Sequence, residues 1–90
     1  MDFEIFKKEF IDICAAWRIP IPHIHESADF SNHTSATDIH VYVEPGEDVA
    51  FQAAHIFGHY LCDLHGDNEK YQDKIANRIA RWATQKEEIA

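Results

Sequence analysis

The sequence predicts a small α+β domain in which a small antiparallel sheet packs against three helices. Apolar residues recur every three or four positions in three separate segments, as in amphipathic helices. Between the first two of these segments, residues 39–44 are rich in β-branched and aromatic side chains, as in a half-buried strand. The chain of 90 residues suits one hydrophobic core, so we expect residues 1–90 to form a single domain.

The first helix is predicted over residues 2–17. Its apolar stripe consists of Phe3, Phe6, Phe10, Ile13, Cys14 and Trp17. Pro20 and Pro22 end the helix, because proline lacks an amide hydrogen and disfavours helical geometry in the residue before it. Strands are expected between residues 22 and 44, the clearest being Ile39–Glu44. Glu47 and Asp48 in the following turn are placed to cap the next helix.

Two further helices are predicted over residues 49–64 and 68–85. The second helix has the core stripe Ala50, Ala53, Phe57, Tyr60, Leu61 and Leu64. Gly66 follows it as a left-handed capping residue. The buried side of the third helix is formed by Tyr71, Ile75, Ala76, Ile79, Trp82 and Ala83.

The charge balance narrows the choice of partners. Acidic residues number 16 against 8 basic residues, giving a formal net charge of −8. This balance argues against direct binding of nucleic acid or an anionic membrane, both of which require a basic surface. A secretory signal and a membrane-spanning run are absent from the sequence, so we expect a cytoplasmic protein with Cys14 and Cys62 reduced. The field of such a charge favours a basic protein partner, but the charge alone does not identify one.

His55 and His59 are the first candidates for a functional site. A spacing of four places both imidazoles on one side of a helix, where they can bind one zinc ion. The same spacing also occurs in histidines that are only packing or surface residues. Four other histidines, His23, His25, His33 and His40, are expected to be partly exposed polar residues. Cys62 is either a soft additional metal ligand or, as we favour, a buried thiol.

The surrounding residues favour the metal site. Ala53-Ala54-His55-Ile56-Phe57-Gly58-His59-Tyr60-Leu61 resembles the zinc-binding helix of the ImmA/IrrE-like metallopeptidases, which typically reads A-H-E-[FL]-G-H-[YL]-L. Asp73-Lys74-Ile75-Ala76-Asn77-Arg78-Ile79-Ala80 is similar to the E-x-x-A-N-x-[FI]-A segment of that family. The resemblance implies a minimal zincin-like domain, with His55, His59 and Asp73 as zinc ligands. Asp73 is one methylene shorter than the glutamate of the family, so we expect Zn²⁺ to bind weakly or not at all. The other interpretation of Asp73 is an ordinary first-turn helix residue that interacts with the helix dipole.

Ile56 departs from the pattern of the family. A glutamate at this position takes a proton from the zinc-bound water, and such general-base catalysis contributes about 10²–10⁴-fold to the rate. Isoleucine cannot do this. Glu47, Asp63, His65 and Glu69 are nearby in sequence, but none stands at the required helical position. The resemblance places residue 56 at the wall of a cleft rather than in the core.

These observations leave three functions open. The first is a catalytically impaired metallopeptidase-like domain that acts as a regulatory protein-binding module. Its partner would be a transcriptional repressor of a phage or mobile element, or a host regulator, as the resemblance implies. The second is an active zinc-dependent peptidase or hydrolase that uses a substitute base. The third is a metal-free interaction or structural domain.

Overall fold

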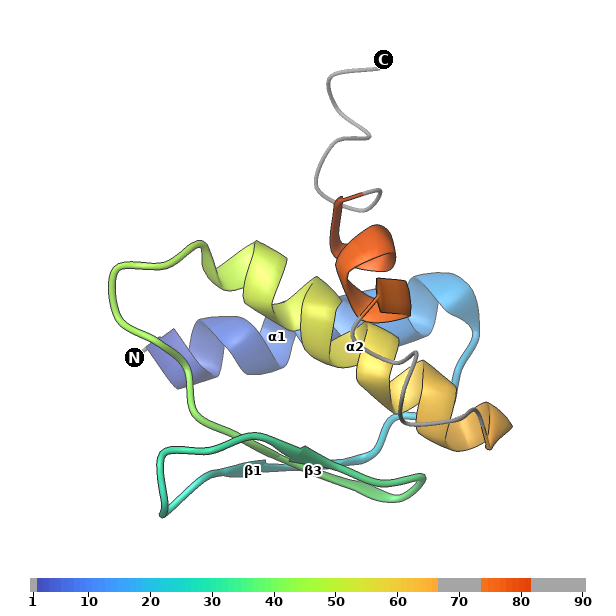
Figure 1. The fold of residues 1–90 in the computed structure, drawn as a ribbon, viewed down its shortest axis with the longest axis horizontal. Helices are drawn as coiled ribbons and strands as arrows, with labels where there is room; N and C mark the ends of the chain where they lie inside the picture. Colours follow the sequence, from blue (N-terminus) through green and yellow to red (C-terminus); the bar gives the residue numbers. More distant parts are fainter. Residues whose placement is uncertain (1, 67–73, 82–90) are drawn as a thin grey trace.

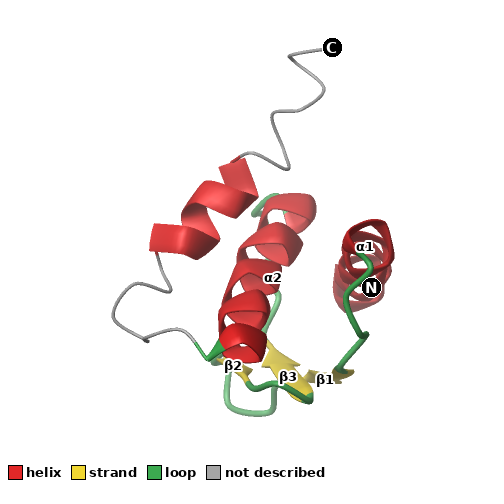
Figure 2. Cartoon of the chain, turned by 90° about the vertical axis from the view of Figure 1, so that its right-hand side faces the viewer, coloured by secondary structure: helices red, strands yellow, loops and turns green. Residues whose placement is uncertain are grey.

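The described chain forms a helix, three consecutive strands and then two further helical segments, the order expected for an α+β domain. The structure, a computed structural model, describes residues 2–66 and 74–81. The elements are α1 (Asp2–Trp17), β1 (His23–Glu26), β2 (His33–Thr34), β3 (Asp38–Val41) and α2 (Val49–His65), and residues 74–81 are also helical. The helices all lie on one side of the sheet, with α2 between α1 and the helix over residues 74–81 (Figure 1, Figure 2). The α+β class is confirmed.

Helix α1 has the predicted bounds and buries the middle of the predicted stripe. Phe6, Phe10 and Cys14 are fully buried. The helix ends where Arg18 adopts a positive φ of 57°. The amide of Ile19 then donates to the carbonyl of Cys14 at 2.9 Å, which satisfies a carbonyl that the helix leaves without a partner.

The sheet is mixed rather than wholly antiparallel, which corrects the prediction. Its order is β1-β3-β2, and only the β2–β3 pair is antiparallel. Strands β1 and β3 are parallel, with His23 opposite Asp38 and Glu26 opposite Val41. After β1, the chain forms β2, which becomes the opposite edge of the sheet. It then turns back and forms β3 between β1 and β2. Alternation of polar and apolar residues fixes which face is buried, but it does not fix the direction of the neighbouring strand.

Helix α2 begins and ends with the predicted capping residues. Asp48 is the N-cap, and its Oδ1 accepts hydrogen bonds from the amides of Ala50 at 2.9 Å and Phe51 at 3.2 Å. Gly66 is the C-cap in the left-handed conformation, with φ 71°. The helix ends at His65, one residue beyond the predicted end.

The hydrophobic core lies where α1 and α2 meet above the inner face of the sheet. Phe10 packs edge-on against Phe57, with ring centroids 6.0 Å apart, and its ring also lies 5.8 Å from that of Tyr60. Ile39 and Val41 contribute from β3 and are buried. The hydroxyl of Tyr60 donates to the carbonyl of Pro20 at 2.5 Å, which ties α2 to the segment between α1 and β1.

The helix over residues 74–81 packs against α2 at a glycine. A Cβ atom added to Gly58 would lie 2.5 Å from the Cα of Ala76, so only glycine permits this approach of two helices. Ala76 and Ala80 are buried there, as small residues at a close helix contact. The remainder of the predicted helix over residues 68–85, including Tyr71 and Trp82, lies outside the described residues. Within the described ranges, no helix is long and apolar enough to cross a membrane.

Candidate metal centre and cleft

The structure brings the two predicted histidines of α2 together. The Nε2 atoms of His55 and His59 lie 3.2 Å apart, and the ring centroids are separated by 4.9 Å with an angle of 67° between the rings. Both side chains are half-buried, and Nδ1 of His55 is buried. Each imidazole therefore directs one ring nitrogen toward the other from successive turns of one helix.

The separation of these nitrogens suits a shared metal ion. Two ligands at about 2.0–2.1 Å from a tetrahedral zinc ion lie roughly 3.3–3.4 Å apart. The observed 3.2 Å is close to this value. The same distance also fits a hydrogen bond in which one neutral imidazole donates to the other. The distance between the two nitrogens is therefore compatible both with a pair that holds a metal ion and with a hydrogen-bonded pair.

A cleft of about 410 Å³ borders His55. It is enclosed by the end of β3, the loop before α2, the first half of α2 and the helix over residues 74–81. Its lining residues are Asn32, Val41, Tyr42, Glu44, Glu47, Asp48, Phe51, Gln52, His55, Ile56 and Asn77. The described lining contains three carboxylates and no lysine or arginine, so the cleft carries negative charge beside the histidine pair.

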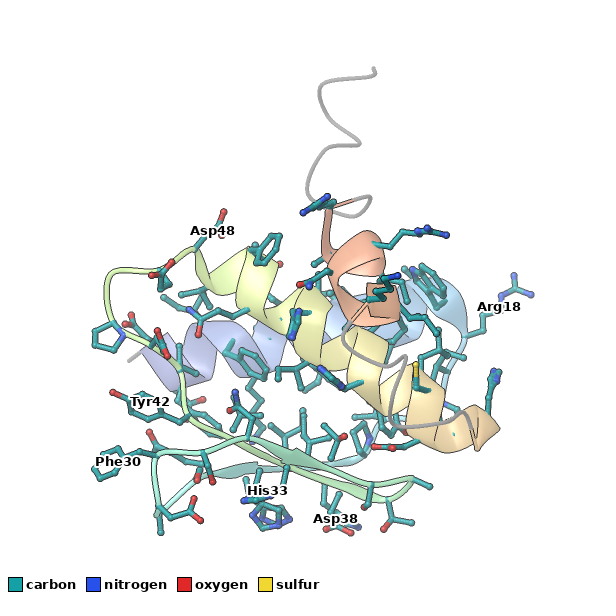
Figure 3. All side chains as sticks on the ribbon, viewed as in Figure 1. Arg18, Phe30, His33, Asp38, Tyr42 and Asp48 are labelled. Atoms are coloured by element: carbon teal, nitrogen blue, oxygen red, sulfur yellow. The ribbon has the colours of Figure 1, made fainter. Side chains whose placement is uncertain are left out.

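Hydrogen bonds hold the walls of this cleft in place. The side-chain amide of Gln52 pairs with the backbone of Glu44, accepting from its amide at 2.9 Å and donating to its carbonyl at 3.2 Å. Asn32 accepts from the amide of Tyr42 at 2.8 Å. The ring of Tyr42 packs edge-on against Phe30, with centroids 5.2 Å apart, and the two lie together at one end of the sheet (Figure 3).

Ile56 lines the cleft next to His55, so the expected position at the cleft wall is confirmed. The expectation that it lies outside the core is wrong. Its side chain is only 5% exposed and belongs to the same buried cluster as Phe57 and Val41. An α-helical residue between a cleft and a sheet can serve both, because a branched side chain is wide enough to contact each.

The remaining candidate residues differ in where they lie. Asp73, the predicted third ligand, lies outside the described residues, as does Glu69. Glu47 lines the cleft, whereas Asp63 accepts a hydrogen bond from Thr34 on β2, and His65 is exposed at the end of α2. Of the four substitute bases considered, Glu47 is therefore the one that the described structure places in the same cleft as His55.

The two cysteines are buried and form no disulfide, as predicted. Burial raises the pKa of Cys14 to about 11, so this thiol stays protonated at neutral pH. Cys62 is 1% exposed. Within residues 2–66 and 74–81, no three His, Cys, Asp or Glu side chains are placed to hold one metal ion together.

Sequence reasoning missed the polar residues that shape the cleft. Tyr42, Gln52 and Asn77 come from three elements and share no motif spacing. One signal was present for Gln52: a polar residue one turn into a helix faces back toward the preceding loop. Comparison with known protein families, with curated proteins and with solved structures finds no match.

Proposed function

We propose that this chain is a catalytically impaired, ImmA/IrrE-like metallopeptidase domain that acts in the cytoplasm as a regulatory protein-binding module. The observation that supports this most is the 3.2 Å separation of the His55 and His59 nitrogens beside a cleft whose wall carries Ile56 in place of a base. The cleft is the binding surface in this proposal. Its occupant is a protein segment, for which a transcriptional repressor or another regulator is the candidate.

His55 and His59 would hold the metal, with Asp73 as the proposed third ligand. A divalent metal ion bound there supplies a Lewis acid that polarises a carbonyl group. Because Ile56 has no proton-transferring group, the residue after His55 cannot activate water. The bound segment would therefore be retained rather than cleaved. Its backbone and polar groups would meet Tyr42, Gln52 and Asn77, and any cationic side chains would be attracted by the carboxylates of the cleft.

Zinc content tests the metal half of the proposal. We expect protein purified without a metal-affinity column to contain less than one equivalent of zinc, and to take up zinc when it is added. The double variant His55→Ala/His59→Ala should take up less zinc than the wild type, with the zinc held at α2 lost, and Asp73→Ala should weaken uptake at α2. His65→Gln, a change at the exposed end of α2, is the matched control and should bind as the wild type does. Uptake that is unchanged in the double variant would exclude the α2 pair as the site.

The binding half is tested with two variants that each introduce one lysine. Phe51→Lys changes a residue that lines the cleft, whereas Ile5→Lys changes a residue of α1 that is 51% exposed and does not line it. Cross-linking to proteins of the source cell should give a partner that wild type and Ile5→Lys retain and that Phe51→Lys loses. The partner should remain uncleaved during incubation. Equal retention by both variants would mean that the cleft is not the binding surface.

A second function is favoured by the position of Glu47. Because Glu47 lines the same cleft as His55, a carboxylate is present that could act as the base of a zinc-dependent hydrolase. Cleavage of the partner that is abolished by Glu47→Gln, but not by Glu26→Gln on β1, would establish hydrolysis in place of retention.

A further inference from the structure

The helices leave the outer face of the sheet uncovered (Figure 2). Four histidines lie on this face. Ile24, Ile39 and Val41 point toward the core, and the residues that alternate with them therefore point outward. These are His23 and His25 on β1 and His40 on β3, all exposed, with His33 of β2 exposed beside them. His33 and Asp38 are seen on this side of the sheet in Figure 3.

Strand register places three of these histidines in one row. His25 lies opposite His40 in the parallel pair, and His33 lies opposite His40 in the antiparallel pair. The rings of His25 and His40 stack with centroids 4.5 Å apart and an interplanar angle of 18°. One imidazole from each of three neighbouring strands therefore lies at the same level of the sheet.

Hydrogen bonds fix the tautomer of the two outer histidines of the row. Nε2 of His25 lies 3.0 Å from Oδ1 of Asp38. The hydrogen bonds from Thr37 and from His25 hold the pKa of Asp38 below its usual value, so the carboxylate only accepts and His25 must donate from Nε2. The lone pair of a neutral His25 ring is then on Nδ1.

His33 is fixed in the same way through a serine. The hydroxyl of Ser31 donates to Oδ1 of Asp29 at 2.7 Å, so its oxygen is left to accept from Nε2 of His33 at 2.8 Å. Hydrogen bonds from Ser27 and Ser31 hold the pKa of Asp29 well below its usual value, which keeps this carboxylate an acceptor. In His25 and in His33, Nε2 is therefore occupied by a hydrogen bond that leads to a carboxylate, directly or through Ser31. Nδ1 of each ring is left available.

We propose that the outer face of the sheet binds a divalent transition metal ion, such as Zn²⁺, through the imidazoles of His25 and His40. Metal-binding histidines characteristically donate their other ring nitrogen to a carboxylate, which orients the ring and makes the ligating nitrogen more basic. Asp38 does this for His25. The ring of His40 is exposed, so rotation about its side-chain bonds can bring one of its nitrogens toward an ion at Nδ1 of His25, while His25 keeps its hydrogen bond to Asp38.

This site is separate from the α2 pair and does not depend on the proposed function. No third described ligand converges with His25 and His40, so the other coordination positions of the ion are left to water or to a donor from another molecule. Imidazole is a ligand that suits zinc, copper and nickel alike, and chemical selectivity among them is low. The ligand class is therefore a borderline or soft divalent cation, rather than calcium or magnesium, which prefer oxygen.

The test is a titration of the full chain with Zn²⁺ at pH 7.5, followed by long-range proton–nitrogen NMR of the imidazole rings. Before metal is added, His25 and His33 should show the tautomer protonated at Nε2. On addition of zinc, Nδ1 of His25 and one nitrogen of His40 should shift. Because each ring is observed separately, binding at His55 and His59 is distinguished from binding at the sheet.

Three variants decide the result. His40→Gln should abolish the shift at His25, and Asp38→Asn should weaken zinc binding at the sheet by about tenfold to a hundredfold. His65→Gln, at the exposed end of α2, should leave it unchanged. All three changes are on exposed or half-exposed side chains, so each variant should fold, and thermal melts check this. Shifts confined to the α2 histidines, or an unchanged response of His25 in His40→Gln, would overturn the proposal.

Discussion

Ile56 illustrates how one side chain can serve two environments. It is 5% exposed, packs in the main core cluster and forms part of the wall of the cleft beside His55. A carboxylate at this place would face the cleft beside His55 on one side and buried apolar side chains on the other. The isoleucine contributes packing to the core but has no group that can transfer a proton.

Ile56→Glu should destabilise the domain in a pH-dependent way. Burial raises the pKa of the introduced carboxyl group above its unfolded value of about 4.3. Between those two pKa values the folded state binds more protons, so the free energy of unfolding falls as the pH rises. Ile56→Gln is the uncharged control and should cost roughly 1–3 kcal/mol at all pH values, for an amide buried without a full set of partners.

Denaturant melts of both variants between pH 4 and pH 8, with and without zinc, check this prediction. Zinc should restore stability to Ile56→Glu above pH 5 and have less effect on Ile56→Gln, because only the carboxylate gains from a nearby cation. Identical pH profiles for the two variants would show that the introduced carboxyl group escapes to solvent.

Among the elements, the contact of α2 with the helix over residues 74–81 depends on Gly58. Alanine normally stabilises a helix interior relative to glycine by about 1 kcal/mol. At this position the added Cβ would lie 2.5 Å from the Cα of Ala76, which is backbone and cannot turn away. We expect Gly58→Ala to lower the free energy of unfolding by roughly 1–3 kcal/mol, the usual cost of overpacking.

Hydrogen exchange identifies which helix is destabilised by Gly58→Ala. The amides of residues 78–80 should lose protection in Gly58→Ala, whereas those in the middle of α1 should keep theirs. Ala76→Gly added to Gly58→Ala removes one of the two clashing atoms and should recover part of the loss in protection. A Gly58→Ala variant that is more stable than the wild type would mean that the two helices are not in contact in solution.

The elements also show what the sequence determines. Helices α1 and α2 have the predicted bounds to within one residue, because their apolar stripes, the prolines at 20 and 22, and the caps at Asp48 and Gly66 are all local signals. The mixed sheet does not follow from the sequence, since β1 and β2 are only four and two residues long and the direction of pairing depends on the path of the loop between them.

The candidate site also contains a part that the sequence predicts and a part that it does not. His55 and His59 can be found from the sequence because helical spacing relates them, whereas the cleft beside His55 follows from the approach of three elements that the sequence does not relate. Sequence patterns present His25, His33 and His40 as separate polar residues. Histidines that alternate with apolar strand residues are a signal of one exposed face, but the row itself needs the register of three strands.

For the whole molecule, the carboxylates of the outer sheet face should contribute to acid sensitivity. The folded state lowers the pKa of Asp38 through hydrogen bonds from Thr37 and His25. A lowered folded-state pKa gives stability that is present above the unfolded pKa of about 3.9 and is lost as the pH falls through the folded value. The difference in melting temperature between wild type and Asp38→Asn should therefore shrink as the pH falls below about 4.

Thermal melts from pH 7 to pH 2 measure that difference. Asp12→Asn on the exposed side of α1 is the control, because the ion pair of Asp12 with Lys8, at 3.6 Å, is largely exposed to solvent and stabilises the fold little. The melting temperature of this control should stay close to that of the wild type at every pH. A difference for Asp38→Asn that is constant down to pH 2 would contradict the lowered pKa.

The central position of β3 has a consequence for the order of assembly. Strands β1 and β2 each pair with β3 and not with each other. During synthesis, no ladder of this sheet can form until residues 38–41 have emerged, although β1 and β2 precede them in the chain. Once β3 is present, the β2–β3 ladder closes over residues 35–37 and the β1–β3 ladder over residues 27–37, and loops of these lengths cost little entropy to close. The sheet should therefore appear in one kinetic step, and the late arrival of a single four-residue strand sets when that step begins.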